Sequence, residues 1–244
     1  YIARKRKVMR KNILKAAAVT AMLWSAASSA QSVQLDLSDP SKNKLDSIVS
    51  LPIKSLKAVE ANGEILFMSE NGRFVLRGQL YDIWYKDTLD TSAQIQDAAT
   101  RIHFERMGAD LDDYNTLTIG SGDKQVVAFV DPLCSVCHKL MKDAEKLGRN
   151  YTFKFVVVPA LGEESNKLAR KVYCAKDRQG SLDAYMQNTL ETVPQKSSCD
   201  TKQYDLTLMM AHLLDVKGVP FVVAPDGRYS QGRPQELQQW LEGK

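Results

Sequence analysis

The 244-residue chain contains only four cysteines, and it has no internal repeat and no low-complexity tract. The apolar run from Ala16 to Trp24 is too short to cross a bilayer, which needs about 20 apolar residues in a helix. The cysteines are also too scattered for a four-cysteine zinc site, because that site needs two close pairs and Cys174 and Cys199 are well separated. The closely spaced pair Cys134 and Cys137 is therefore the main candidate for a functional site.

The N-terminal segment has the pattern of a secretory signal. From Met9, a basic stretch through Lys15 precedes the apolar run Ala16–Trp24, and a small-residue cleavage site ends at Ala30. The eight residues before Met9 are interpreted as upstream translation or a start-site artefact. The alternative, an ordinary N-terminal helix, would present a poor core face because its end is rich in serine and alanine.

Removal of this segment changes the charge of the protein. Residues 1–30 hold seven of the 33 basic residues and no acid, so 26 basic residues remain against 29 acidic ones, a formal charge of −3. A slightly acidic protein gives no support to nucleic-acid binding, which depends on basic surface. Export would place the cysteines in an oxidising compartment, where disulfides persist.

Residues 33–89 are predicted to be mostly strand. Ile65–Met68 and Phe74–Leu76 flank Asn71-Gly72, a dipeptide typical of a tight hairpin turn, and the second arm is expected to continue to Trp84. One amphipathic helix is expected over Ser38–Leu51. Open strand edges in so small a segment favour pairing with another chain.

A helix is expected over Thr91–Met107, either as a rigid connector or as a surface helix of one domain. From Leu117 onward the pattern becomes α/β. The expected strands are Val126–Val130, Phe153–Val158 and Phe221–Val223, the last followed by a turn at Asp226-Gly227. Helices are expected after the close cysteine pair, on a face with Val136, Leu140, Met141, Ala144 and Leu147, and over Ser165–Lys176, Leu182–Glu191, Tyr204–Asp215 and Pro234–Glu242.

The motif Cys134-Ser135-Val136-Cys137 follows a buried strand and begins a helix. A helix N-terminus presents unpaired N–H groups and a partial positive charge, so a cysteine there is stabilised as a thiolate. Thiols in such positions have pKa values of roughly 3.5–7.5. Cys134 is therefore predicted to attack disulfides, and Cys137, one turn into the helix, to resolve the mixed disulfide.

Other readings of the motif remain open. An inert disulfide or half a zinc site is one alternative. With His138 the motif also matches the attachment pattern of a c-type haem, with Met141, Met209 or Met210 as an axial ligand. The strand before the motif favours a redox site over haem, and the three methionines are more simply explained as core residues.

Two further features accompany the motif. Gly218-Val219-Pro220 precedes a strand, and a cis Pro220 would expose the backbone groups of Val219 to a substrate, although local sequence favours a trans bond. Cys174 and Cys199 are expected to form a structural disulfide, but four cysteines allow three pairings.

Together these residues resemble the periplasmic thiol–disulfide isomerases of the DsbC/DsbG type. The resemblance rests on Asp131–Leu140, on Gly218–Pro220 and on Gly78–Trp84, which is similar to the end of that family's N-terminal domain. It covers essentially all of the chain after the signal. It implies an α+β fold, with a small cystatin-like dimerisation domain over 31–90, a linker helix over 91–112 and a thioredoxin-like domain with a helical insertion over 113–244.

The resemblance also implies function. It makes Cys134 the nucleophile, Cys137 the resolving thiol, Val219 and Pro220 the substrate-binding pair, and Cys174–Cys199 the structural disulfide. It implies a V-shaped periplasmic homodimer that acts on misfolded secreted proteins, is reduced by a DsbD-type membrane protein, and needs no metal or diffusible cofactor.

Two differences from the family pattern leave other functions possible. The dipeptide between the cysteines is Ser135-Val136, where well-known members have Gly-Tyr or Pro-Tyr. Val219 stands where threonine is usual and is more similar to the DsbA-type oxidases. A DsbG-like chaperone or thiol reductase and a DsbA-like oxidase are therefore the alternatives to an isomerase.

Overall fold

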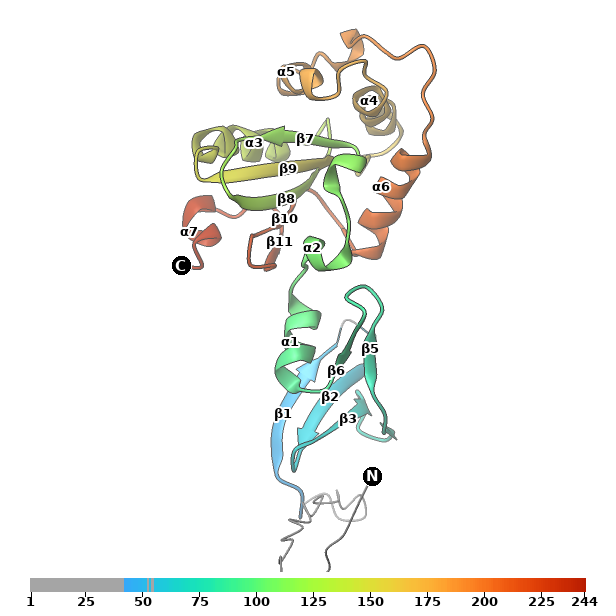
Figure 1. Cartoon of the computed structure of the whole chain (residues 1–244), viewed down its shortest axis with the longest axis vertical. Coiled ribbons are helices and arrows are strands. Elements are labelled where there is room, and N and C mark those ends of the chain that lie inside the picture. The colour runs from blue at the N-terminus through green and yellow to red at the C-terminus, as the bar shows by residue number, and fades with distance from the viewer. Residues whose placement is uncertain (1–41, 52, 54) are drawn as a thin grey trace, which may run out of the picture. The chain divides into compact units, whose positions relative to one another are not determined.

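The computed structural model describes residues 42–51, 53 and 55–244 (Figure 1). The expected signal and its cleavage site at Ala30 lie outside these residues. Within them, no helix combines the length and the apolar character that a membrane crossing requires. The α+β prediction is confirmed, since the described chain forms three sheets together with α and 3-10 helices.

The N-terminal part is an antiparallel meander of β1 (Leu45–Ser50), β2 (Leu56–Ala61), β3 (Glu64–Ser69) and β4 (Val75–Leu76), paired in that order. The β3–β4 hairpin and its turn are confirmed: Gly72 has a φ of 70°, and its N–H donates to the carbonyl of Ser69 at 2.8 Å. Glycine takes this left-handed conformation without a steric penalty.

Two expectations for this region are wrong. The helix over Ser38–Leu51 is replaced, in its described part, by strand β1, in which Ile48 pairs with Val59 of β2. Cross-strand pairing there outweighs the helical spacing of the apolar residues. The second hairpin arm does not continue to Trp84 either, because β5 (Leu80–Asp82) pairs with β6 (Asp87–Leu89) in a separate ribbon.

The expected helix over Thr91–Met107 is interrupted. Helix α1 (Ser92–Thr100) starts with a capping box between Thr91 and Gln94, and α2 (Phe104–Met107) follows after a break. Arg101 is extended, and the N–H of Ile102 donates to the carbonyl of Gly227 at 2.9 Å. The backbone leaves the helix here because it pairs with the turn at Gly227. That turn was expected from Asp226-Gly227 and is confirmed.

The C-terminal part is built on a five-stranded sheet in the order β11-β10-β8-β9-β7. Strands β8 and β9 are parallel and the other neighbours are antiparallel. The strands are β7 (Thr116–Ile119), β8 (Lys124–Val130), β9 (Tyr151–Val157), β10 (Phe221–Val223) and β11 (Tyr229–Gln231). The expected strands over 126–130, 153–158 and 221–223 are confirmed as β8, β9 and β10, whereas β7 and β11 were not predicted.

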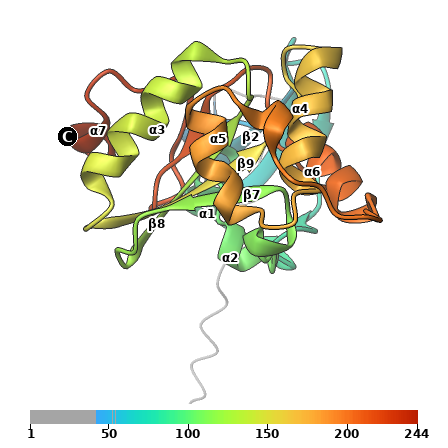
Figure 2. The same cartoon turned by 90° about the horizontal axis from the view of Figure 1, so that it is seen from above.

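Helices cover both faces of this sheet, so its strands are apolar on both sides. Along β8, Val126 and Val130 face one core, while Val127 and Phe129 face the other. Helices α3, α4 and α7 contribute to one core, whereas Phe104 of α2 and Met210 of α6 belong to the other; in Figure 2, α3 and α7 are seen at the left and α4 and α6 at the right. The helices are α3 (Ser135–Leu147), α4 (Glu163–Tyr173), α5 (Leu182–Met186), α6 (Lys202–Leu213) and α7 (Leu237–Leu241).

Short 3-10 turns complete the part of the chain that the structure describes; they are η2 (Leu111–Asp113), η3 (Gln179–Ser181) and η4 (Leu190–Thr192). The expected helix over Leu182–Glu191 is split into α5 and η4. On α3, Leu140, Met141 and Ala144 are fully buried as expected, but Val136 is 41% exposed. Cys137 takes the inward position on that first turn, and its neighbour Val136 therefore faces solvent.

Candidate active site

The start of α3 places both cysteines at the end of β8. Cys134 is the N-cap of α3, with extended backbone angles, and its Sγ accepts the Cys137 N–H at 3.1 Å. A charged acceptor at this position gains both from the hydrogen bond and from the helix dipole. Cys134 is 7% exposed and Cys137 is fully buried, and the structure joins them in a disulfide. The geometry thus offers one sulfur to an incoming disulfide and keeps the other behind it.

The Val219–Pro220 segment lies directly against Cys134. The peptide bond between these residues is cis, and the Val219 carbonyl oxygen lies 3.7 Å from the Cys134 sulfur. The Pro220 carbonyl accepts the Gly232 N–H at 2.8 Å, which holds this loop at the edge of the sheet. Val219 also lines an open groove of about 640 Å³. Two motifs that are 85 residues apart in sequence therefore meet at one sulfur.

Asp131, which the sequence reasoning did not single out, lies beneath the cysteine turn. It is fully buried, and its Oδ1 accepts hydrogen bonds from the Leu133 N–H at 2.8 Å and the Ser165 hydroxyl at 2.9 Å. Its Oδ2 accepts the Leu161 N–H at 2.9 Å. The one signal in the sequence was an acidic residue placed directly after a fully apolar strand.

Tyr185 of α5 also supports the cysteine turn. Its hydroxyl donates to the Asp131 carbonyl at 2.6 Å. Burial, with a smaller contribution from the charge of Asp131, raises the pKa of Tyr185 well above its usual value of 10. The hydroxyl therefore stays protonated and remains a donor. The His138 ring stacks on the Tyr185 ring with centroids 5.0 Å apart.

The contacts of His138 and of the three methionines bear on the alternative of a c-type haem. His138 Nε2 lies 2.9 Å from the Pro132 carbonyl oxygen, so this ring nitrogen already has a partner. Met141 and Met210 are buried in the core as expected, but Met209 is 52% exposed and that expectation is wrong. The described residues contain no group of three or more histidine, cysteine or acidic side chains arranged for a metal ion.

Cys174 and Cys199 form the second disulfide in the structure, with Cα atoms 5.6 Å apart. Cys174 caps the C-terminus of α4, and Cys199 lies just before α6. Both half-buried side chains pack against the core that also contains Cys134. The bridge therefore joins the end of α4 to the segment that leads into α6.

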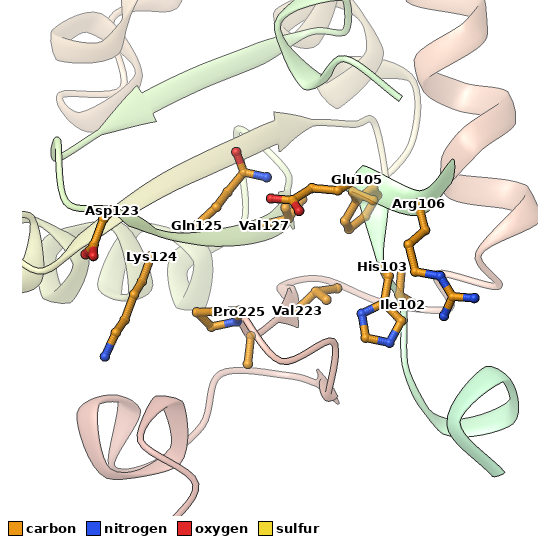
Figure 3. Close-up of a pocket in the computed structure, with 12 residues that line it drawn as sticks. Ile102, His103, Glu105, Arg106, Asp123, Lys124, Gln125, Val127, Val223 and Pro225 are labelled. Atoms are coloured by element: carbon orange, nitrogen blue, oxygen red, sulfur yellow. The ribbon is translucent and has the colours of Figure 1, made fainter. Parts of the chain in front are cut away.

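A separate cavity of about 360 Å³ contains neither cysteine pair (Figure 3). It lies between the α1–α2 break and the ends of β8 and β10, and Figure 3 shows charged side chains of both signs around it, namely Glu105, Arg106, Asp123 and Lys124. No cysteine lines it, and we assign the thiol chemistry to the cysteine turn instead.

Comparison with known proteins fits this geometry. The family described as the disulfide bond isomerase protein N-terminal domain matches residues 25–90. The protein "Thiol:disulfide interchange protein DsbC" from Dickeya dadantii is 29% identical over 199 residues, which cover 78% of each chain. The protein of the same name from Escherichia coli K12 is 26% identical over 207 residues, which cover 82% of each chain.

The chain is similar over most of its length to DsbC thiol:disulfide interchange proteins, and its N-terminal part matches the model of their N-terminal domain. Among solved structures, a disulfide interchange protein from Neisseria gonorrhoeae is 23% identical with a TM-score of 0.46, covering 55% of this chain and 97% of that one. Helicobacter pylori DsbG is 20% identical with a TM-score of 0.36, covering 74% of this chain and 93% of that one. These structural likenesses are distant, and the similarity to DsbC proteins rests on the sequence matches.

Proposed function

We propose that this DsbC-like chain is a periplasmic protein disulfide isomerase and reductase. The observation that carries the proposal is the position of Cys134. Its sulfur accepts a helix N–H at 3.1 Å and lies 3.7 Å from the Val219 carbonyl. The first contact favours the thiolate, which is the attacking species. The second places backbone groups of Val219 where an extended substrate can pair with them.

The reaction starts from the reduced pair. The Cys134 thiolate attacks one sulfur of a non-native disulfide, a new S–S bond forms to that sulfur, and the other substrate sulfur leaves as a thiolate. In isomerisation, a different substrate thiolate then attacks the mixed disulfide and releases Cys134, so no electrons are gained or lost overall.

Reduction of the substrate follows another second step. The Cys137 thiol loses its proton and attacks Cys134, which releases the substrate as a dithiol and leaves the Cys134–Cys137 disulfide. Two electrons must then be returned to this pair, and we propose a membrane reductase of the DsbD type as their source. Because Cys137 is fully buried, only Cys134 is open to a protein substrate.

The N-terminal sheet supports a homodimer as part of the same proposal. Strands β1 and β4 are its outer strands, and Leu45, Ile48, Val75 and Leu76 on them are exposed. Unpaired strand edges with apolar side chains favour pairing with a second copy. We propose the domain limits 31–90, 91–112 and 113–244 for the dimerisation, linker and catalytic regions, following a signal that ends near Ala30. Sedimentation equilibrium measures the expected dimer mass.

Refolding of scrambled ribonuclease tests the proposed activity. Wild-type protein should restore ribonuclease activity in a redox buffer, and Cys134→Ser should restore none above the buffer. Cys137→Ser should retain part of the activity, since isomerisation can finish without it. If Cys134→Ser refolds ribonuclease as well as the wild type, the proposed mechanism is wrong.

An oxidase of the DsbA type is the second candidate, and Val219 favours it. This residue, which faces the Cys134 sulfur, is a valine rather than the threonine that the resemblance leads one to expect. Acid trapping followed by thiol alkylation in cells separates the two candidates. A mostly reduced pair supports the isomerase, and a mostly oxidised pair supports the oxidase.

A further inference from the structure

Asp131 is a buried acid that the proposed exchange steps do not use. Both carboxylate oxygens accept hydrogen bonds, from Leu133, Ser165 and Leu161 at 2.8 to 2.9 Å. The group accepts all three and donates none, which is the pattern of an ionised carboxylate. An asparagine could not replace it fully, because its NH₂ group would face a donor, the N–H of either Leu133 or Leu161.

The charge of Asp131 has no counter-ion among the residues that the structure describes. No lysine, arginine or histidine forms an ion pair with it, although its side chain is fully buried. Hydrogen bonds alone therefore offset the free-energy cost of burying the charge. Electrostatic interactions with other groups in such a place are screened much less than at the surface.

The cysteine turn is built directly on Asp131. The N–H of Cys134 donates to the Asp131 carbonyl at 3.1 Å, and the N–H of Leu133 donates to its carboxylate. The same carboxylate holds Leu161, from the loop after β9, and Ser165 of α4. One residue thus joins three segments around the site and places a buried carboxylate on the same turn as Cys134.

We propose that Asp131 is a positioning residue whose buried negative charge makes the cysteine pair more reducing. When Cys134 is a thiolate, two negative charges belong to the same buried turn, which raises the free energy of the reduced protein. The disulfide carries no such charge and is unaffected. Asp131 therefore biases the pair toward giving electrons to a substrate, a property that a reductase and isomerase needs. This inference rests on the proposed function and deepens it.

The helix amides oppose this effect. The Cys137 N–H stabilises the Cys134 thiolate, whereas Asp131 destabilises it. Other titratable groups around the turn are Tyr185, which is a neutral donor, Tyr204 of α6, His138, and two lysines of the adjacent groove, Lys139 and Lys142. The potential of the site reflects the balance between the amides and lysines on one side and Asp131 on the other.

Comparison of Asp131→Asn with Ser165→Ala distinguishes the effect of the Asp131 charge from the effect of a lost hydrogen bond. Each variant disturbs a hydrogen bond at the same carboxylate, but only Asp131→Asn removes the charge. The first measurement is the equilibrium in which the protein dithiol and glutathione disulfide give the protein disulfide and two glutathione thiols. We expect Asp131→Asn to shift this equilibrium at least about tenfold toward the dithiol, equivalent to a change of about one pKa unit.

The second measurement is the ultraviolet absorbance of the thiolate in the reduced protein. Its titration midpoint should move to lower pH in Asp131→Asn and stay near the wild-type value in Ser165→Ala. Equal small changes in both variants, with lowered thermal stability alone, would mean that Asp131 has only a structural role and would overturn the inference.

Wild-type protein provides a readout if Asp131→Asn does not fold. In reduced protein, the ¹³C carboxyl signal of Asp131 should show a second step at the pH where Cys134 titrates, because interacting groups titrate together. Absence of that step also overturns the inference. The proposed function fails in a different way, since ribonuclease refolding would then be unaffected by Cys134→Ser while these two titrations could still be coupled.

Discussion

Removal of the Cys174–Cys199 disulfide should lower the stability of the C-terminal part by a calculable amount. The bridge closes a 25-residue loop that contains α5 and η4. In the chain-entropy model, a loop of this length restricts the unfolded chain by about 3.5 kcal/mol at 25 °C. That loss is large but smaller than the 5–15 kcal/mol typical of a whole domain, so the variant should still fold.

The folded loop retains other contacts when the bridge is absent. Lys196 donates its N–H to the Cys174 carbonyl at 2.9 Å, and Lys176 donates to the Pro194 carbonyl at 2.9 Å. These hydrogen bonds keep both ends of the loop close together in the native state. The expected loss therefore arises mainly from a freer unfolded chain.

Urea unfolding measures this loss most cleanly in a background without the reactive pair. Cys134→Ser/Cys137→Ser protein serves as the reference, and Cys174→Ala/Cys199→Ala is added to it. The free energy of unfolding should fall by about 3–4 kcal/mol. A fall below about 1 kcal/mol would refute the reasoning, because the bridge would then be closing a loop that stays ordered in the unfolded state.

Three further predictions concern particular contacts. Partial burial acts to raise the pKa of Asp143, but hydrogen bonds, first that from Arg233, outweigh it and lower this pKa below its usual 3.8. Asp143 therefore adds stability that is present above about pH 4 and is lost as the pH falls further, so Asp143→Asn should lower the unfolding temperature at pH 7 but have little effect near pH 2. Gly122→Ala should cost about 1–3 kcal/mol in urea unfolding, because its Cβ would overlap the backbone before β9, whereas Gly78→Ala, with open space around it, should be nearly neutral. Ile95→Ala, which empties a fully buried site beside the N-terminal sheet, should cost about 2–5 kcal/mol by the same measurement.

Sequence patterns predicted those elements whose neighbours in the chain decide their structure. Phe221–Val223 was predicted as a strand with the limits that the structure gives it, since a short apolar run between proline and a turn has few alternatives. The helix after the cysteines was predicted because Leu140, Met141 and Ala144 repeat at helical spacing. By contrast, Leu45, Ile48 and Val49 fit a helical spacing equally well, and only pairing with β2 decides that they form a strand.

In the candidate site, too, some features follow from local sequence and others depend on contacts between distant segments. The place of Cys134 at a helix start follows from local sequence, because strand, turn and helix are consecutive. The contact between Cys134 and Val219 depends on the order of strands in the sheet, which places β10 beside β8. The partners of Asp131 at Leu161 and Ser165 lie 30 and 34 residues away, and no local pattern identifies them.

The cysteine motif alone therefore predicts thiol–disulfide exchange, but it does not predict the reduction potential of the pair. The two cysteines and the amides of α3 are supplied by consecutive residues, so any chain with this motif at a helix start obtains a reactive thiolate. The opposing charge of Asp131 is held in the interior by three hydrogen-bond donors, two of which come from α4 and the loop after β9. We therefore expect the helical segment between β9 and β10 to hold the buried charge that shifts the potential of the pair. Removal of that charge should change how readily Cys134 and Cys137 are oxidised without altering which sulfur attacks, whereas loss of a single donor, as in Ser165→Ala, should not.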